Sequence, residues 1–479
     1  MYKPTIGLEI HCELKTNTKM FCGCKNDPEE RHPNINICPI CTGHPGCLPT
    51  VNKEAVRSVI KLGMALGAKI ATVSKFDRKN YFYPDLPKAY QISQYDQPLV
   101  SDGALKGIRL ERVHLEEDTA RIAHSSQLAD YPKDAAAASL IDYNRSSIPL
   151  MELVTKPDIE TGEQAVAFAK ELQLILRYLG ISDADMEKGQ MRVEANISVS
   201  KNEQLGTKVE VKNLNSFRAV SDSIDFEIKR QIELLEKGEK VVQSTRGWDE
   251  KKKETVLQRM KEAAHDYRYF PEPDIPPLDL AHFDMESIRE EIVELPQQKR
   301  DRLAGEYGLS EAHVGMLAEN VAAADWFEEA VSEAKALDAS ASAQAVYNYF
   351  ANDLQGLIKE AGIGLDAIKI DPFHFAKLVV FATQGKLNSR LAKDVLKNMF
   401  ETGSDPEEIM QAQGLNETVS AEQLEAIIKD VIEKSPQVVA DYRKGNENVL
   451  QALIGRVMKE TNGRANPAGL VELFKKILA

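Results

Sequence analysis

The chain has 479 residues, of which 43% are hydrophobic and 28% charged, and its formal net charge is −14. That length predicts about three globular domains, and the negative charge argues against binding nucleic acid through bulk charge, although a local basic surface could still contact RNA. There is no run of about 18 apolar residues, and no signal peptide is visible at the N-terminus. We therefore expect an intracellular, cytoplasmic protein that does not span a membrane.

The first predicted strand, residues 5–14, alternates between apolar and polar side chains, which therefore lie on opposite faces. The apolar face carries Leu8, Ile10, Cys12 and Leu14. The polar face carries Glu9, His11 and Glu13. Two carboxylates and an imidazole on one face suit a divalent cation. The alternative is a solvent-facing edge strand, which this segment taken by itself slightly favours.

All six cysteines lie within the first 47 residues, which indicates one metal site rather than the disulfide scaffold of a small secreted protein. Cys22 and Cys24 form one close pair, Cys38 and Cys41 form a second, and 13 residues separate the pairs. This spacing predicts a closed tetrahedral zinc site, which is structural because four thiolates leave no open position. Cys12 is predicted to be a core thiol. The nearby substitute ligands are Cys47, His32 and His44.

A helix is predicted to follow Asn52 and to end at Gly67. After it, residues 75–85 (KFDRKNYFYPD) interleave cationic and aromatic side chains. Such a segment can bind phosphate or stack a base, and a surface strand with cross-strand aromatic pairs is an equally good interpretation.

A β-bulge is predicted near residues 111–112, because Ile108 and Leu110 are out of phase with Val113 and Leu115. Bulges often re-aim side chains beside active sites. The polar residues that follow this bulge are His114, Glu116, Glu117 and Asp118.

Further helices are predicted at residues 161–179 and 216–237, with strands at 191–198 and 207–212 between them. The two strands are predicted to form a hairpin whose polar faces lie side by side. Those faces carry Arg192, Glu194, Asn196 and Ser198 on one strand and Lys208, Glu210 and Lys212 on the other. Residues 213–217 could cap the next helix, which would leave backbone N–H groups from Asn213 onward for an anion.

Five carboxylates, if they share one cleft, would repel one another and raise some of their pKa values. These are Glu9, Glu13, Glu117, Glu194 and Glu210. A bound metal together with Lys75, Lys79 and Arg192 would resolve the repulsion, and oxygen ligands favour Mg²⁺ held with nucleotide phosphates. Neither GxxxxGK[ST] nor GxGxxG occurs, so any ATP site is of another kind.

The chain changes character beyond Pro296, where almost every segment has helical periodicity. A break at residues 402–406 (TGSDP) predicts two helical units. We therefore predict an α+β fold class: an N-terminal domain at residues 1–292 with a mostly antiparallel sheet and helices, then all-helical domains at 293–405 and 406–479. In the two helical domains, helices are expected at residues 344–361, 372–384, 389–401, 421–434 and 470–478.

Several unusual strings resemble the B subunit of the glutamyl/aspartyl-tRNA amidotransferases. They are residues 6–14 (IGLEIHCEL), 75–85, 88–94 (KAYQISQ), 114–118 (HLEED), 210–216 (EVKNLNS), 266–274 (DYRYFPEPD) and 462–467 (NGRANP). The resemblance runs through most of the chain. The archaeal E-type relative carries a large inserted domain, for which this chain is too short.

The resemblance implies a cradle domain that uses ATP to phosphorylate the side-chain carboxylate of glutamate or aspartate misacylated on tRNA(Gln) or tRNA(Asn). It also implies two partners in a heterotrimer: an amidase (A) subunit, which hydrolyses glutamine and supplies ammonia, and a small C subunit. The four cysteines would form a zinc knob at about residues 20–45, and the helical tail would hold the tRNA.

Matching positions also imply site residues. Magnesium would be bound by Glu9, His11 and Glu117, with Glu194 and Glu210 as further candidates. Lys79 would contact phosphate in catalysis, and Lys75 and Asn213 would join the nucleotide site. No single basic residue is assigned to tRNA.

Two other functions compete with this interpretation. One is a non-catalytic, zinc-containing tRNA-binding scaffold, although a scaffold does not need five carboxylates facing one cleft. The other is a metal-dependent hydrolase centred on His11, which the absence of HExxH and of paired-histidine spacing disfavours.

Overall fold

A computed structural model describes residues 2–125, 138–260, 267–415, 421–443, 449–461, 465 and 467–478. It divides into two compact units, residues 1–296 and 297–479. Of the strings that resemble the amidotransferase B subunits, residues 462–467 lie mostly outside the described residues. Asp266, the first residue of the string 266–274, also lies outside them. No helix in the described part is both long and apolar enough to cross a membrane.

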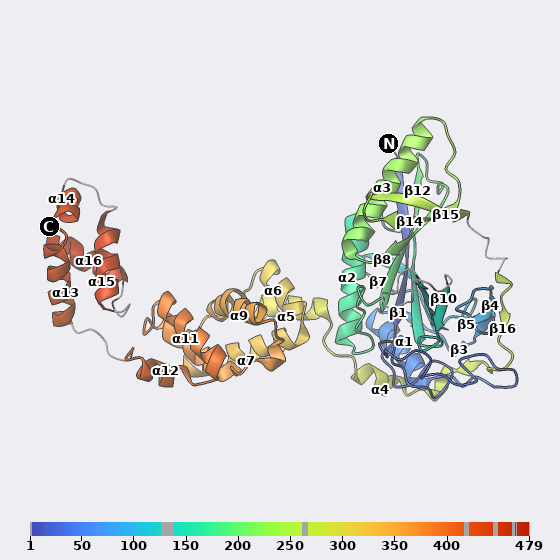
Figure 1. The fold of residues 1–479 in the computed structure, drawn as a ribbon, viewed down its shortest axis with the longest axis horizontal. Coiled ribbons are helices and arrows are strands. Elements are labelled where there is room, and N and C mark those ends of the chain that lie inside the picture. Colours follow the sequence, from blue (N-terminus) through green and yellow to red (C-terminus); the bar gives the residue numbers. More distant parts are fainter. Residues whose placement is uncertain are drawn as a thin grey trace. The chain divides into compact units, whose positions relative to one another are not determined.

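The first unit is built on a ten-stranded sheet (Figure 1). In spatial order its strands are β15 (Glu254–Met260), β14 (Ser244–Asp249), β13 (Val209–Leu214), β12 (Met191–Ser200), β1 (Lys3–Glu13), β11 (Pro149–Thr155), β8 (Ile108–Glu117), β6 (Val100–Ser101) and β2 (Lys69–Ile70), with β7 (Ala104–Leu105) beside β8. Of these neighbours only β13 and β14 run parallel. The predicted mostly antiparallel sheet and α+β class are therefore confirmed.

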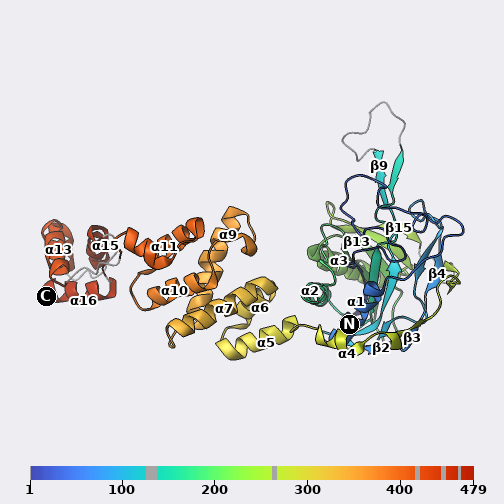
Figure 2. The same cartoon turned by 90° about the horizontal axis from the view of Figure 1, so that it is seen from below.

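Three smaller sheets accompany the large one. They are β16 (Phe270–Pro271) with β4 (Asp77–Asn80) and β5 (Tyr90–Ser93), β9 (Arg121–His124) with β10 (Ser139–Asp142), and β3 (Val73–Ser74) with β17 (Leu278–Asp279). The sheet β16-β4-β5 lies beside the large sheet, on the side away from helices α2 and α3 (Figure 1), and β5 contacts β8. The pair β9-β10 projects from the body of the unit (Figure 2).

The helices of the first unit pack on the apolar side of the large sheet. They are α1 (Lys53–Ala65), α2 (Gly162–Tyr178), α3 (Phe217–Glu236) and α4 (Met285–Glu290). Their apolar stripes form one core with the apolar face of β1, where Leu8, Ile10 and Cys12 are fully buried. Cys12 is thus a core thiol, as predicted. The opposite face of β1 is left to carry polar side chains.

Helices α1, α2 and α3 begin close to their predicted starts. The side chains of Asn52, Thr161 and Ser216 accept hydrogen bonds from backbone N–H groups at the starts of α1, α2 and α3. The predicted bulge in β8 is also confirmed. The consecutive β11 residues Val154 and Thr155 pair with Arg112 and Leu110 of β8, so the β8 residue between these two has no partner in the register. The predicted hairpin is β12-β13, whose second strand begins and ends two residues later than expected.

The second unit is helical, as expected. Its helices are α5 (Pro296–Tyr307), α6 (Glu311–Ala318), α7 (Val321–Leu337), α8 (Ala343–Asn348), α9 (Gln355–Ala361), α10 (Pro372–Thr383), α11 (Ser389–Thr402), α12 (Pro406–Ala412), α13 (Ala421–Glu433), α14 (Pro436–Arg443), α15 (Leu450–Glu460) and α16 (Pro467–Leu478), with a π-helix at Tyr349–Leu354. It contains two hydrophobic cores, one within residues 303–410 and the other within 428–478. The domain boundaries at 292/293 and 405/406 stay predictions.

Candidate active site

A cavity of about 1990 Å³ lies against the polar face of the large sheet. Polar side chains of the large sheet line one side of it, among them Glu9, His11, His114, Glu116, Glu152, Glu194 and Glu210. The other side is lined by residues 267–270 and by many of residues 79–95, in and around the sheet β16-β4-β5. The alternation of β1 positions Glu9 and His11, because the same pleat that buries Leu8 and Ile10 turns the intervening residues outward.

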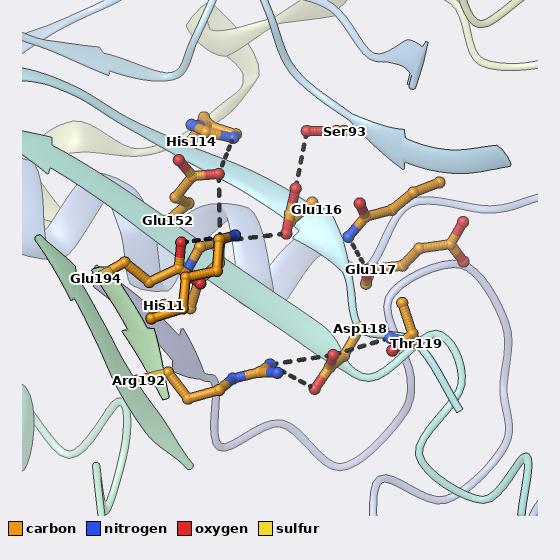
Figure 3. Close-up of polar contacts among 12 residues, drawn as sticks. His11, Ser93, His114, Glu116, Glu117, Asp118, Thr119, Glu152, Arg192 and Glu194 are labelled. Carbon is orange, nitrogen blue, oxygen red and sulfur yellow. Dashed lines mark hydrogen bonds and ion pairs between the residues drawn. The ribbon is translucent and has the colours of Figure 1, made fainter. Parts of the chain in front are cut away.

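His11 lies between two carboxylates from neighbouring strands (Figure 3). Its Nε2 is 3.4 Å from Glu152 Oε2 on β11 and 3.8 Å from Glu116 Oε1 on β8. Nε2 of His114 lies 3.2 Å from the same oxygen of Glu152. Burial would lower the pKa of His11, but the charges of Glu152, Glu116 and Glu194 outweigh it and raise the pKa to about 9. The cluster therefore attracts positive charge strongly.

A second carboxylate cluster lies on the adjacent strands. Glu9 faces Glu194 in the register of β1 and β12, and Glu210 comes from β13. Lys212 Nζ joins two of them, at 2.9 Å from Glu194 Oε2 and 3.5 Å from Glu210 Oε1, and Asn196 Nδ2 donates to Glu9 Oε1 at 2.8 Å. One ligand atom from each of His11, Glu116 and Glu152 lies within 4.8 Å of the others, and the same holds for Glu9, Glu194 and Glu210. Each group of three is close enough to share one cation.

Lys79 supplies a cation on the other side of the cavity. It is the third residue of β4, and its Nζ lies 5.3 Å from the ring centre of Tyr267 and 5.9 Å from that of Tyr81. Burial would lower the pKa of Lys79, but Glu116, Tyr269 and Glu152 hold it well above its usual value. No carboxylate of the described residues lies within ion-pair distance of Nζ, so its charge is available to a ligand in the cavity.

Glu117 does not join Glu9 and His11. It points to the opposite side of β8 from Glu116 (Figure 3), where its carboxylate accepts hydrogen bonds from the backbone N–H of Ile92 at 2.9 Å and from Lys88 Nζ at 2.7 Å. The reason is the bulge: after it, Val113, Leu115 and Glu117 share one face. Glu116 takes the position that Glu117 was expected to occupy.

Three other expected residues also lie apart from the cavity lining. Lys75 Nζ pairs with Asp77 at 2.9 Å and Asp96 at 2.8 Å. Asn213 is an exposed strand residue with φ of 64°. The side chain of Ser216 caps α3 by accepting a hydrogen bond from the backbone N–H of Ala219. Glu13 is buried and does not line the cavity, and burial and the neighbouring Asp118 raise its pKa to about 7.

Glu152 was not singled out from the sequence. Its signal is a single charge in the otherwise apolar run of residues 149–155 (PLMELVT), which forms β11. That run shows that Glu152 is unusual, but pairing across 141 positions decides that it faces His11. His114, noted after the bulge without a role, completes the same cluster.

The four predicted zinc ligands do come together. Sγ atoms of Cys22, Cys24, Cys38 and Cys41 lie within 4.8 Å of one another. A tetrahedral site with Zn–S bonds of about 2.3 Å places its sulfurs roughly 3.8 Å apart, and Cys38 and Cys41 are 3.9 Å apart. Cys47 is exposed and is not in the group. The donor set therefore fits a tetrahedral thiolate-bound metal.

Lys19 provides independent support for negative charge at this cysteine group. Its side chain is fully buried, and no carboxylate of the described residues lies within ion-pair distance. Its Nζ contacts Cys41 Sγ at 3.9 Å and donates to the backbone oxygen of Tyr143 at 3.1 Å. A buried ammonium without an anion is costly, and thiolates bound to a metal would supply that anion.

Two family models match the chain. One, described as the GatB/GatE catalytic domain, covers residues 4–286, and the other, described as a GatB domain, covers residues 325–478. Together they span most of the chain. The chain belongs to the GatB family. The catalytic-domain match contains every residue that lines the cavity and all four clustered cysteines.

Full-length relatives are named as the B subunit of aspartyl/glutamyl-tRNA(Asn/Gln) amidotransferase. The protein from Dehalococcoides mccartyi is 44% identical, and the match covers 100% of this chain and 99% of that protein. The proteins from Carboxydothermus hydrogenoformans and Crocosphaera subtropica are 43% and 41% identical, with coverage of 100% of this chain and 99% and 98% of their own lengths. The resemblance that the sequence indicated is thereby confirmed.

Proposed function

We propose that this protein uses ATP to phosphorylate the side-chain carboxylate of glutamate or aspartate misacylated on tRNA, and that ammonia then replaces the phosphate. The observation that carries this proposal is one cavity with two carboxylate clusters on one side and, on the other, the cation of Lys79, which no described carboxylate pairs. At about 1990 Å³ the cavity exceeds the roughly 300–1,000 Å³ of a single-ligand site. It can therefore take a nucleotide and an aminoacyl group together.

The two carboxylate clusters fit Mg²⁺. His11, Glu116 and Glu152 would hold one ion, and Glu9, Glu194 and Glu210 another, because hard oxygen donors and an imidazole at these separations suit a small divalent cation. When bound, Mg²⁺ neutralises phosphate charge and orients the phosphates. Oxygen-rich clusters on one side of a cavity and a cation on the other are the arrangement that a phosphoryl-transfer site needs.

The chemistry explains why a phosphate is required. A free carboxylate is a poor electrophile, so a carboxylate oxygen first bonds to the γ-phosphorus of ATP while the bond from that phosphorus to the oxygen of ADP breaks. The nitrogen of ammonia then bonds to the acyl carbon, a proton is lost and phosphate leaves. Lys79 would bind the transferred phosphoryl oxygens, because its ammonium group lines the cavity without an ion-pair partner among the described residues.

Partners follow from the relatives' name, which marks one subunit of a larger enzyme. We infer that an amidase partner releases ammonia from glutamine and that a small third component completes a heterotrimer. Glu-tRNA(Gln) and Asp-tRNA(Asn) are both candidate substrates, since the relatives' name includes both. A non-catalytic scaffold is disfavoured, because the match described as a catalytic domain contains the whole cavity lining.

The test is release of γ-phosphate from ATP by the assembled complex, measured with and without Glu-tRNA(Gln) or Asp-tRNA(Asn). The variant Glu152→Gln keeps the shape of the side chain and removes its charge, so tRNA-dependent release should fall at least about 100-fold. Glutamine hydrolysis by the partner should persist. Glu160→Gln, at an exposed carboxylate paired with Lys3, is the matched control. A folded Glu152→Gln complex with full transamidation would contradict the proposal.

We also propose that the cysteine group holds zinc in a structural role. The purified chain should contain about one zinc. Cys38→Ser should lose it and retain transamidation, whereas a wild-type chain without zinc would overturn this assignment.

A further inference from the structure

Exposed aromatic side chains concentrate at the cavity. Among the described residues, five aromatic side chains are strongly exposed, and four of them line this one cavity. They are Phe82, Tyr83, Tyr95 and Phe270, with exposed fractions of 86%, 61%, 49% and 45%. The fifth, Phe373, lies on α10 in the helical unit. Because exposed aromatic rings are costly in water, their collection at one rim indicates a ligand with flat apolar faces.

The rim continues inward as a chain of tyrosines. Tyr95 and Tyr269 are stacked, with ring centres 4.4 Å apart and planes 11° apart, and Tyr267 meets Tyr269 edge-on at 6.1 Å. Tyr81 meets Tyr267 edge-on at 5.9 Å. The chain ends beside Lys79, the candidate phosphate contact, so the aromatic surface runs from solvent to the reaction site.

Hydrogen bonds hold the backbone of the segment that carries the inner tyrosines. Asn80 Nδ2, at the end of β4, donates to the backbone oxygens of Tyr267 at 3.3 Å and of Arg268 at 2.8 Å. Arg268 has φ of 45°, a conformation that non-glycine residues rarely adopt and that clusters at functional sites. Arg268 is exposed, lies between Tyr267 and Tyr269 in the chain and lines the cavity. The two hydrogen bonds from Asn80 therefore tie the backbone at Tyr267 and Arg268 to the end of β4.

We propose that this aromatic rim, defined as Phe82 and Tyr83 with Tyr95, Tyr267, Tyr269 and Phe270, stacks the unpaired bases at the 3′ end of the aminoacyl-tRNA. This inference rests on the proposed function. Aromatic faces interleaved with cations are how proteins bind single-stranded nucleic acid without reading its sequence. The amino acid is esterified to the terminal ribose, so the last bases must lie next to the cavity when the side-chain carboxylate reacts.

The adenine of ATP is another flat aromatic ring that could stack on the rim. A thermodynamic cycle distinguishes adenine from the bases at the 3′ end of the tRNA. Binding of tRNA(Gln) to the assembled complex is compared with binding of the same tRNA without its last three nucleotides. Both are measured for the wild type, for Phe82→Ala/Tyr83→Ala and for Phe82→Leu/Tyr83→Leu, which keeps apolar bulk. Phe373→Ala is the matched exposed-aromatic control. The KM for ATP and the size of the complex are measured in parallel.

Stacking one base on an aromatic ring is worth roughly five- to 150-fold in affinity. Truncating the tRNA should therefore weaken wild-type binding at least tenfold, and both double variants should weaken binding of intact tRNA similarly. Truncation should then weaken binding less in the variants than in the wild type, because part of the lost contact is shared. Phe373→Ala should match the wild type, and the KM for ATP should stay within twofold.

Three results would overturn the proposal. Independent, multiplicative losses would show that the rim does not contact the 3′ end. A raised KM for ATP with unchanged tRNA binding would assign the rim to adenine. A complex that fails to assemble would assign it to a protein contact. If the wild-type complex releases no γ-phosphate in the presence of aminoacyl-tRNA, the proposed function itself fails, and that result is separate from all three.

Discussion

Replacing Lys19 with methionine tests whether the cysteine group carries negative charge from a bound metal. Methionine fills a similar volume without charge, so the packing of this fully buried position is largely kept. Four thiolates on Zn²⁺ carry a net charge of about −2, and Lys19 Nζ lies 3.9 Å from Cys41 Sγ. In the metal-bound protein the substitution removes an attraction, and in the metal-free protein it removes a buried, unpaired cation.

The size of the effect follows from that distance. A unit charge pair about 4 Å apart contributes roughly 4 kcal/mol at an effective dielectric constant of about 20. The lost donor to the backbone oxygen of Tyr143 adds a cost of about 1 kcal/mol in both states, so it cancels in metal affinity. Zinc affinity should therefore fall by up to about 1,000-fold, while the metal-free chain should be unchanged or more stable.

The assay is competition for zinc between the purified chain and a chelator of known affinity, with unfolding by denaturant measured on metal-free samples. Lys15→Met is the matched control, because Lys15 is exposed and pairs with the exposed Asp183. Equal zinc affinity in Lys19→Met and wild type would refute the reasoning. So would a metal-free variant that loses several kcal/mol of stability, because Lys19 would then have a structural role unrelated to metal.

Three further predictions concern the cavity and its walls. Glu116→Gln should reduce tRNA-dependent γ-phosphate release about 100-fold, at least tenfold more than Glu117→Gln, and equal activities would contradict the placement of Glu116. Glu117→Gln should instead lower the free energy of unfolding by about 3 kcal/mol, because it leaves the largely buried ammonium group of Lys88 without its carboxylate partner. Lys79→Met should cut the same release about 100-fold with unchanged unfolding, and an active variant would exclude Lys79 as the phosphate contact. Arg78→Lys should lower the free energy of unfolding by about 1–2 kcal/mol, because lysine cannot reproduce the two hydrogen bonds, at 2.7 and 2.8 Å, that Arg78 donates to buried Glu272. Denaturant unfolding measures this change, and an unchanged midpoint would show that these bonds do not hold β16 against β4.

Local sequence patterns determined much of the architecture. Alternation predicted which face of β1 carries Glu9 and His11, and helical periodicity predicted close to where α1, α2 and α3 begin. The Cys-x-Cys and Cys-x-x-Cys pairs predicted the cysteine group. These features depend on a few neighbouring residues, so periodicity and spacing are sufficient to find them. The bulge in β8 belongs with them, because a shift of hydrophobic phase is itself a local signal.

The choice between Glu116 and Glu117 could also have been made from the sequence. Once the phase shifts, Glu117 continues the apolar face of Val113 and Leu115, and Glu116 is turned to the polar side. Glu117 was expected in the site because it lies in a string of residues that resembles the family. Such a match gives the position of a residue along the chain but does not state on which face of the strand its side chain lies. A bulge that moves the pairing by one residue exchanges the two faces.

Other features were decided only by the tertiary structure. Glu152 faces His11 because β11 lies beside β1, and Lys75 is unavailable because Asp77 and Asp96 surround it. Tyr95 stacks on Tyr269 across 174 positions of the chain. The two-residue repeat of a strand or the 3.6-residue repeat of a helix fixes the face on which a side chain lies. It does not identify the residue of another element that will contact that face. The sequence alone therefore determined the polar face of the first strand, and long-range strand pairing made that face one wall of a site.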